Sequence, residues 1–211
     1  MPRQSSESAR AAAGAGRKRS YLRRGERKQM LLDVAAGVVE AQGWTALSMS
    51  ALATAAGVSR QLVYHYFPNL ETLIAKTAWH IFNDTIEGTR ASIAAHPGNL
   101  REAAESAEAV TLDLPPGRGD ALWQLIAGTA GATPELERIR RGIRQLVAET
   151  WQPSMESELG LEGEDARAGS WMMVMAFWGM RQLVRDGDLS RERGTAIFNA
   201  LLDRLTRTPE S

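Results

Sequence analysis

Apolar residues recur at helical spacing along most of the chain, and this pattern predicts an all-α protein. Leu31, Val34 and Val38 are separated by three or four residues, as on one face of a helix. Gly43 follows this segment, where a left-handed C-cap is expected. The sequence has no run of alternating β-branched residues of the kind that predicts a strand.

Two very short helices are expected next, with a tight turn between them. Ser48 is a good N-cap for a helix over residues 49–56, and Gly57 ends it. Ser59 caps the second helix, which stops at residues 67–68, Phe-Pro. Two such helices form a helix-turn-helix.

Proline and glycine divide the remainder into longer helices. Asn69 caps a helix that should run into the nineties. Further helices are expected over residues 99–113, 118–131, 134–158, 164–185 and 190–207, about nine in all. The predicted organisation is a flexible basic arm (1–20), a helix-turn-helix domain (21–68) and a larger helical domain (69–211).

The second short helix carries polar side chains that packing does not need. Val58, Val63 and Phe67 should face the preceding helix. The side chains that then point outward are Arg60, Gln61, Tyr64 and His65, with an exposed Leu62 placed to contact a thymine methyl. In the major groove Arg binds guanine and Gln binds adenine, while Tyr hydroxyls hold phosphates. The pattern therefore favours DNA reading, although a helical hairpin with a solvated polar face has the same pattern.

The net charge of zero hides a strong asymmetry along the chain. Residues 1–28 hold nine Arg or Lys against two acidic residues, so the remainder is net negative. A basic arm on an acidic body favours a polyanionic partner near the N-terminus, and Arg17, Lys18 and Arg19 are the candidate contacts. A solvated, idle tail has the same composition.

Several function classes are disfavoured by what the sequence lacks. Without cysteine there are no disulfides or thiolate metal sites, which fits the cytoplasm. The longest apolar run, residues 171–178, is far shorter than the ~20 residues of a spanning helix, so no membrane partner is expected. The three histidines lack HExxH spacing, and the P-loop, G-x-S-x-G and dinucleotide-binding motifs are absent. We expect no enzyme, metal or cofactor. A helical adaptor that binds RNA or an acidic protein is the alternative.

Residues 27–75 resemble the DNA-binding domain of the TetR family of bacterial transcriptional regulators. The resemblance rests on the apolar first helix, on GWTALSMSALATAAGVS, on the YHYF element and on the ETL that opens the next helix. It implies that Ser48 contacts phosphate and that Ser59, Arg60, Gln61 and Leu62 read bases or adjacent backbone. Tyr64 would hold a phosphate, with His65 at the groove edge. Leu70 departs from the family pattern, because a Lys usually follows the helix cap and contributes a phosphate contact.

The resemblance also implies an effector pocket in the C-terminal body. Tryptophan and methionine suit a bulky apolar small molecule, because thioethers adapt to irregular shapes. The candidate effector-binding residues are Trp123, Trp151, Met155, Trp171, Met175 and Trp178. Plain core packing, in a body that only dimerises, would use the same residues.

The last two helices of this family form the dimer interface. Residues 164–185 are apolar nearly all round, as a helix with two buried faces should be. The candidate interface residues are Met172, Ala176, Gly179, Leu183, Ile197, Phe198, Leu201 and Leu205. The resemblance thus implies a DNA-binding domain over residues 21–68 and an effector-binding and dimerisation domain over residues 69–211. The protein it implies is a homodimeric repressor, released from a palindromic double-stranded DNA operator by a bulky apolar small-molecule effector.

Overall fold

The computed structural model describes residues 24–128 and 133–206, and over these residues it contains nine α-helices and no strand, which confirms the all-α prediction. The elements are α1 (Arg24–Gln42), the 3₁₀ helix η1 (Trp44–Ala46), α2 (Met49–Ala56), α3 (Arg60–Tyr66), α4 (Leu70–Ala95), α5 (Leu100–Leu112), α6 (Pro116–Ala127), α7 (Pro134–Leu159), α8 (Gly163–Asp186) and α9 (Arg191–Thr206).

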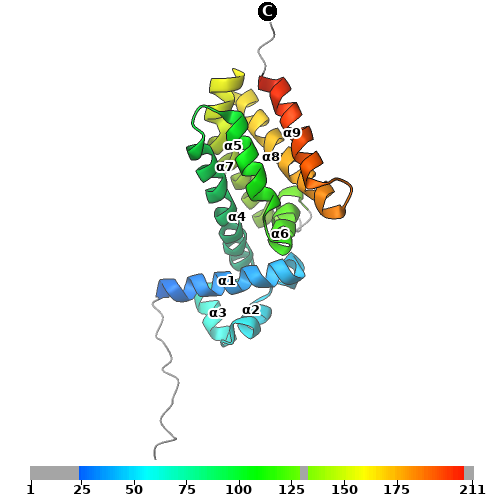
Figure 1. Cartoon of the computed structure of the whole chain (residues 1–211). Coiled ribbons are helices and arrows are strands. Elements are labelled where there is room, and N and C mark those ends of the chain that lie inside the picture. The colour runs from blue at the N-terminus through cyan, green and yellow to red at the C-terminus, as the bar shows by residue number, and fades with distance from the viewer. Residues whose placement is uncertain (1–23, 129–132, 207–211) are drawn as a thin grey trace, which may run out of the picture.

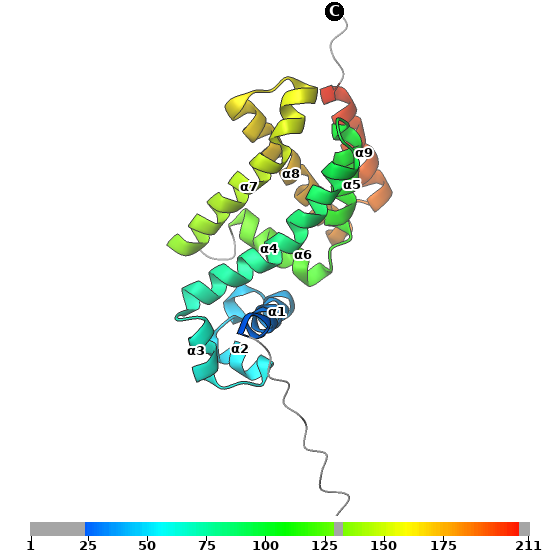
Figure 2. The same ribbon diagram turned by 90° about the vertical axis from the view of Figure 1, so that its left-hand side faces the viewer.

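The helices form a small three-helix unit below a larger helical body. α1 lies across α2 and α3, and the long α4 rises from this unit into the body (Figure 1). Seen from the side, α4 is inclined and runs between the small unit and the bundle of α5–α9 (Figure 2). One continuous helix therefore joins the two parts.

Side-chain caps fix the starts of the helices around the turn. The Oγ of Ser48 accepts from Ala51 N at 3.0 Å, and the Oγ of Ser59 accepts from Leu62 N at 3.2 Å. Gly57 has φ 63° and ψ 35°, a left-handed conformation that glycine adopts without the steric cost of a Cβ. The helix-turn-helix predicted from these residues is confirmed.

Some boundaries differ from those expected. Gly43 has a positive φ of 83°, but its ψ of 170° is extended, so it is not a left-handed C-cap, and η1 follows it. α6 begins at Pro116 rather than 118, because a proline is well placed in the first turn, where its missing N–H has no helical partner. It ends at Ala127 and not at 131, since Gly128 is left-handed.

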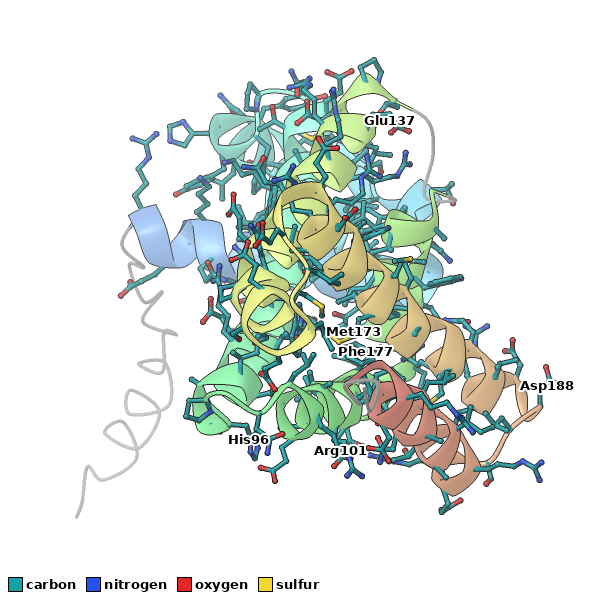
Figure 3. All side chains as sticks on the ribbon, turned by 90° about the horizontal axis from the view of Figure 1, so that it is seen from above. His96, Arg101, Glu137, Met173, Phe177 and Asp188 are labelled. Atoms are coloured by element: carbon teal, nitrogen blue, oxygen red, sulfur yellow. The ribbon has the colours of Figure 1, made fainter. Side chains whose placement is uncertain are left out.

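The core is continuous from the three-helix unit into the body. Val63 and Phe67 are fully buried in the three-helix unit, and Trp151 is fully buried in the body. Seen from the far end of the body, Met173 and Phe177 point into the interior, whereas His96, Arg101 and Asp188 lie at the periphery (Figure 3). None of the helices that the structure describes is long and apolar enough to cross a membrane.

Candidate nucleic-acid interface and effector site

The packing of α3 determines which side chains it presents outward. Val63 is fully buried against the small core, whereas Arg60, Gln61 and His65 are exposed and Tyr64 is 52% exposed. The structure thus brings the four polar candidates to one open surface, which we call the reading face (Arg60, Gln61, Tyr64 and His65).

Leu62, Ser48 and Ser59 lie beside the reading face. Leu62 is half-buried, so the expectation of an exposed leucine is wrong. The hydroxyl oxygens of Ser48 and Ser59 accept from their own helices, and a hydroxyl that accepts one hydrogen bond can still donate another. Leu70 is 40% exposed at the start of α4.

Few cations accompany the reading face. Residues 29–80 contain two basic side chains, Arg60 and Lys76, and α1 adds Arg24, Arg27 and Lys28 in its first two turns. Most of the positive charge near the N-terminus precedes α1 in the sequence. The candidate contacts Arg17, Lys18 and Arg19 lie outside the described residues.

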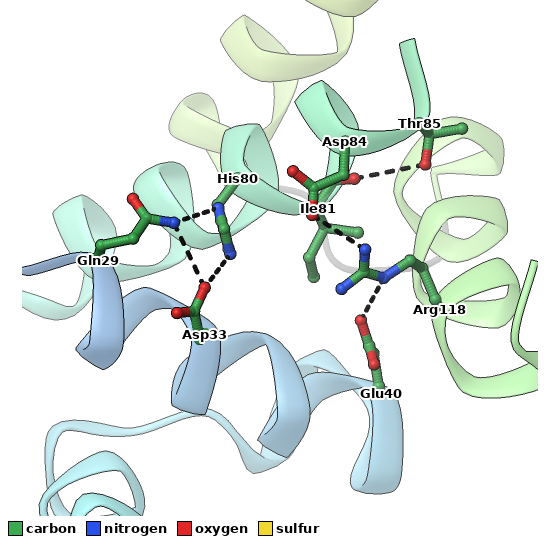
Figure 4. A network of polar contacts seen from close by, with 8 residues as sticks. All are labelled: Gln29, Asp33, Glu40, His80, Ile81, Asp84, Thr85 and Arg118. Carbon is green, nitrogen blue, oxygen red and sulfur yellow. Dashed lines mark hydrogen bonds and ion pairs between the residues drawn. The ribbon is translucent and has the colours of Figure 1, made fainter. Parts of the chain in front are cut away.

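α6 connects the three-helix unit to the body through Arg118. The Arg118 guanidinium donates to Glu40 Oε1 on α1 at 2.7 Å and to Asp84 Oδ2 on α4 at 3.0 Å (Figure 4). Burial lowers the pKa of Arg118, but its bonds to the two carboxylates outweigh this effect, so the pKa is raised above its usual value. Nearby, the Trp44 indole N–H donates to the Ala121 carbonyl oxygen at 2.9 Å.

A second polar contact joins α1 to α4. His80 Nε2 lies 2.9 Å from Asp33 Oδ1, and Gln29 Nε2 lies 3.3 Å from the other ring nitrogen of His80 (Figure 4). The three-helix unit is therefore held at two places, and a shift of α4 or α6 would be carried into α1.

The other side of α6 contacts α8. Asp120 pairs with Arg185 and lies 3.5 Å from Arg181 Nη1. Arg181 is 5% exposed, and its burial lowers its pKa. A Cβ on Gly119 would overlap the Arg181 guanidinium, so a side chain there would require Arg181 to move.

Two of the predicted effector residues line a small cavity in the middle of the body. This central cavity has a volume of about 30 Å³ and is enclosed by five helices, α4 to α8. Trp151 and Trp178 form part of its wall, and Trp151 Nε1 is buried with no hydrogen-bond partner. The remaining lining residues are Phe82, Thr85, Ile86, Thr89, Thr111, Leu122, Ile126, Val147, Val174 and Phe177.

Met155 belongs to a different hollow, an apolar groove at the far end of the body. The groove measures about 350 Å³ and is lined from α5, α7, α8 and α9, with Met172, Ala176, Phe198 and Leu201 among its residues. Trp123, Trp171 and Met175 are half-buried and line neither hollow. The structure does not bring the six candidate effector residues together in one cavity.

Most of the predicted dimer residues form an exposed apolar stripe on α8 and α9. Met172 is 66% exposed, Leu201 is 52%, and Ile197 and Leu183 are 48% and 47%. Ala176 is also exposed, and Gly179 has open space beside it. Phe198 is only 6% exposed, because its ring packs on Phe177 of the same chain, with the ring centroids 4.9 Å apart. The side chain of Leu205 lies outside the described residues.

Two further features contribute to the site, and the sequence indicates only the second of them. Arg118 and Glu40 are 78 residues apart, and nothing local pairs them. The α4 stripe of Phe82, Ile86 and Thr89 has helical spacing, which would have marked it as a buried face.

This arrangement, a short helix with an open polar face set beside a second short helix, defines the helix-turn-helix class of DNA-binding domain. Residues 31–77 match the sequence model of the bacterial regulatory proteins of the tetR family. Over these residues the chain is similar to the DNA-binding domain of that family.

Relatives and solved structures are consistent with this similarity. The HTH-type transcriptional regulator AlkX of Mycobacterium tuberculosis (strain ATCC 25618 / H37Rv) is 27% identical over 142 residues, which span 62% of this chain and 66% of AlkX. A Rhodococcus protein assigned to the TetR family of transcriptional regulators matches 87% of this chain and 100% of its own, with a TM-score of 0.71 at 15% identity. The multidrug binding protein EbrR, solved with imidazole, matches 88% of this chain and 93% of its own, with a TM-score of 0.63 at 21% identity. At such identities the two structures show a common fold.

Proposed function

We propose that the protein is a sequence-specific, DNA-binding transcriptional repressor. The observation that carries the proposal is the orientation of α3: Val63 is buried on one side, and the reading face is open on the other. Arg60 and Gln61 would contact bases, while Tyr64, Ser48 and Ser59 would donate to phosphates and Leu62 and His65 would lie at the groove edge. The match to the family model and the similarity to AlkX support the same function.

The protein would act as a homodimer on a palindromic operator. The exposed stripe on α8 and α9 supports this proposal, because isolated chains seldom expose so many large apolar side chains together. A two-fold pair would place two copies of α3 in successive turns of the major groove, about 34–36 Å apart.

A small-molecule effector would release the operator by widening the central cavity. Four residues of α4 line that cavity, and α4 also carries the three-helix unit. EbrR, which shares the fold, is a multidrug binding protein solved with imidazole. The small size of the central cavity favours a second candidate, a dimeric DNA-binding protein without a sensor.

Salt titration of DNA binding tests the first part of the proposal. We expect the full-length protein to bind duplex DNA from the region flanking its own gene more tightly than RNA of the same length, and the affinity should fall steeply with salt. Deleting residues 1–20, which hold five basic side chains, should make that dependence shallower, by up to about 0.9 in log–log slope for each phosphate that the arm neutralises. Equal binding to RNA would favour the adaptor alternative.

Effector release is tested by linkage. A library of apolar compounds is screened by quenching of tryptophan fluorescence, and each hit is added to the protein–operator complex. A true effector should weaken operator binding about 5–150-fold, and the operator should weaken effector binding equally. Hits that never shift operator binding would leave the regulator without a sensor.

A further inference from the structure

The central cavity contains a polar group that packing does not explain. Trp151 is fully buried, and its indole ring meets Phe177 edge-on with the ring centroids 6.2 Å apart. Its Nε1–H is buried without an acceptor, although buried indole N–H groups usually find one. The residue lines the cavity. An acceptor supplied by a bound molecule would satisfy it.

Two of the three threonine hydroxyls in the cavity wall do not compete for that acceptor. Thr111 Oγ1 donates to the Ala107 carbonyl oxygen at 3.0 Å, and Thr85 Oγ1 donates to the Ile81 carbonyl oxygen at 3.4 Å. Their hydroxyl hydrogens are therefore used within their own helices. The third, Thr89, is only half-buried. Among the residues that line the cavity, Trp151 thus contributes a fully buried indole N–H that has no hydrogen-bond acceptor.

The wall of the cavity also determines the charge and shape of an occupant. None of its lining residues is charged, so an ion would lose its hydration with no counterion to replace it. Aromatic rings enter from three helices, with Phe82 on α4, Trp151 on α7, and Phe177 and Trp178 on α8. Rings of this kind pack best against another flat aromatic molecule, edge-on or offset.

We propose that the central cavity binds a neutral aromatic molecule bearing a hydrogen-bond acceptor, and that the Trp151 indole N–H selects it by donating to that acceptor. The inference rests on the proposed function, since it names the chemical class of the effector. The volume of about 30 Å³ holds one or two water molecules, so such a ligand must widen the cavity. Phe82 and Ile86 of α4 line the same cavity as Trp151 and Phe177, and α4 is the wall that continues to the three-helix unit.

Two probes of the same shape separate the contribution of the acceptor to binding from that of the aromatic rings. Naphthalene and quinoline differ by one ring nitrogen, which accepts a hydrogen bond and is neutral at about pH 8. The full-length protein, labelled with ¹⁵N at its six tryptophan indoles, is titrated with each compound. We expect quinoline to bind about two- to tenfold more tightly than naphthalene, the ratio that one net hydrogen bond provides. Quinoline alone should move the Trp151 N–H proton resonance downfield. N-methylquinolinium, which is charged and has no acceptor, should not bind.

Two matched variants complete the test. Trp151→Phe removes the indole N–H, so the resonance missing from the spectrum of this variant is that of Trp151. The preference for quinoline over naphthalene should disappear in this variant. Trp178→Phe makes the same change in ring size in the same cavity, and the preference should remain. The proposal is overturned if naphthalene binds as tightly as quinoline in the wild-type protein, if neither compound binds, or if the preference survives in Trp151→Phe.

These measurements are made without DNA, so they separate the ligand class from the regulatory role. Quinoline that binds with the expected shift but leaves operator affinity unchanged would support the ligand class and contradict the effector role. Operator release by compounds that do not perturb the Trp151 resonance would contradict the ligand class and support the effector role.

Discussion

Gln61 and Tyr64 are both exposed on the reading face, but they should act differently on DNA. Gln61→Ala should cost about 1–3 kcal/mol and relax the preference at one or two base pairs of each half-site, because a base contact carries sequence information. Tyr64→Phe should weaken binding to all sequences alike, because a phosphate contact carries none. Binding of each variant to an operator and to its single-base variants distinguishes the two effects. If Gln61→Ala leaves both affinity and preference unchanged, then the orientation proposed for α3 on DNA is wrong.

Glu108 offers a prediction about stability and pH. It is 1% exposed on α5 and accepts a hydrogen bond from Thr195 of α9 at 2.8 Å. Burial raises the pKa of Glu108 above its usual value, and the bond from Thr195 offsets this only in part. The folded state therefore takes up a proton more readily than the unfolded state, so the contribution of Glu108 to stability is lost as pH rises through the folded-state pKa.

Glu108→Gln should consequently stabilise the fold at neutral pH and lose this advantage below about pH 4, where the carboxyl is protonated in both states. Thermal melting at both pH values measures the change. Glu164→Gln, at a side chain that is 94% exposed, should alter stability little at either pH. A Glu108→Gln protein that is less stable than the wild type at neutral pH would contradict the pKa direction.

The sequence predicts some residues well and others not at all. The outward positions of Arg60, Gln61 and Tyr64 follow from helical periodicity, because Val63 and Phe67 must be buried. The unpaired indole N–H of Trp151 and the bonds of Arg118 depend on contacts between helices distant in sequence. No local pattern encodes such contacts.

At the scale of elements, α6 lies between the three-helix unit and the body and contacts both of them. A Cβ at Gly117 would overlap the carbonyl oxygen of Glu40, which is backbone and cannot rotate away. Gly117→Ala should therefore push α6 from α1, destabilise the protein by about 1–3 kcal/mol and loosen the contacts of Arg118.

Gly37→Ala is the matched control for this change. Gly37 lies within α1 with nothing near its missing Cβ, so alanine there should stabilise the protein by about 0.5–1 kcal/mol. Denaturant unfolding compares the two variants, and hydrogen exchange should show faster opening of α1 in Gly117→Ala. Equal stability of the two alanine variants would contradict the close contact of α6 and α1.

The stripe on α8 and α9 leads to a prediction about assembly. Leu201→Asp should give monomers on sizing and should abolish operator binding, because a charge would be buried unpaired in the dimer. Leu70→Asp makes the same change at a leucine that is 40% exposed on α4, and it should remain dimeric. A dimeric Leu201→Asp protein would place the interface on another surface.

Elements were predictable to the extent that their ends are marked in the sequence. Asn69 opens α4 as expected, and its Oδ1 accepts from Thr72 N at 2.8 Å. The start of α6 was missed because Pro116 fits a first turn as well as a loop. The central cavity could not be foreseen, since Trp151, Met155 and Trp178 are all apolar and large, and only the packing of α7 on α8 and α9 assigns them to different hollows.

At the scale of the whole molecule, the proposed function requires two reading faces at a fixed separation. Each face is carried by α4, and α4 also lines the central cavity. A ligand that displaces α4 would change the separation of the two faces, and the operator tolerates only spacings near a whole turn of the groove. The match to the TetR family model covers residues 31–77, so the role proposed for the body rests on this coupling.

The central claim, that paired α3 helices read DNA sequence, is tested most directly by selection from random duplex DNA. The full-length protein and Gln61→Ala are each carried through repeated rounds of binding, and the enriched pools are sequenced. The wild-type protein should enrich an inverted repeat whose half-site centres lie about 34–36 Å apart, or a multiple of this, and Gln61→Ala should lose information at one or two positions of each half-site. A wild-type pool that enriches no motif, or only a single unpaired half-site, would contradict the claim.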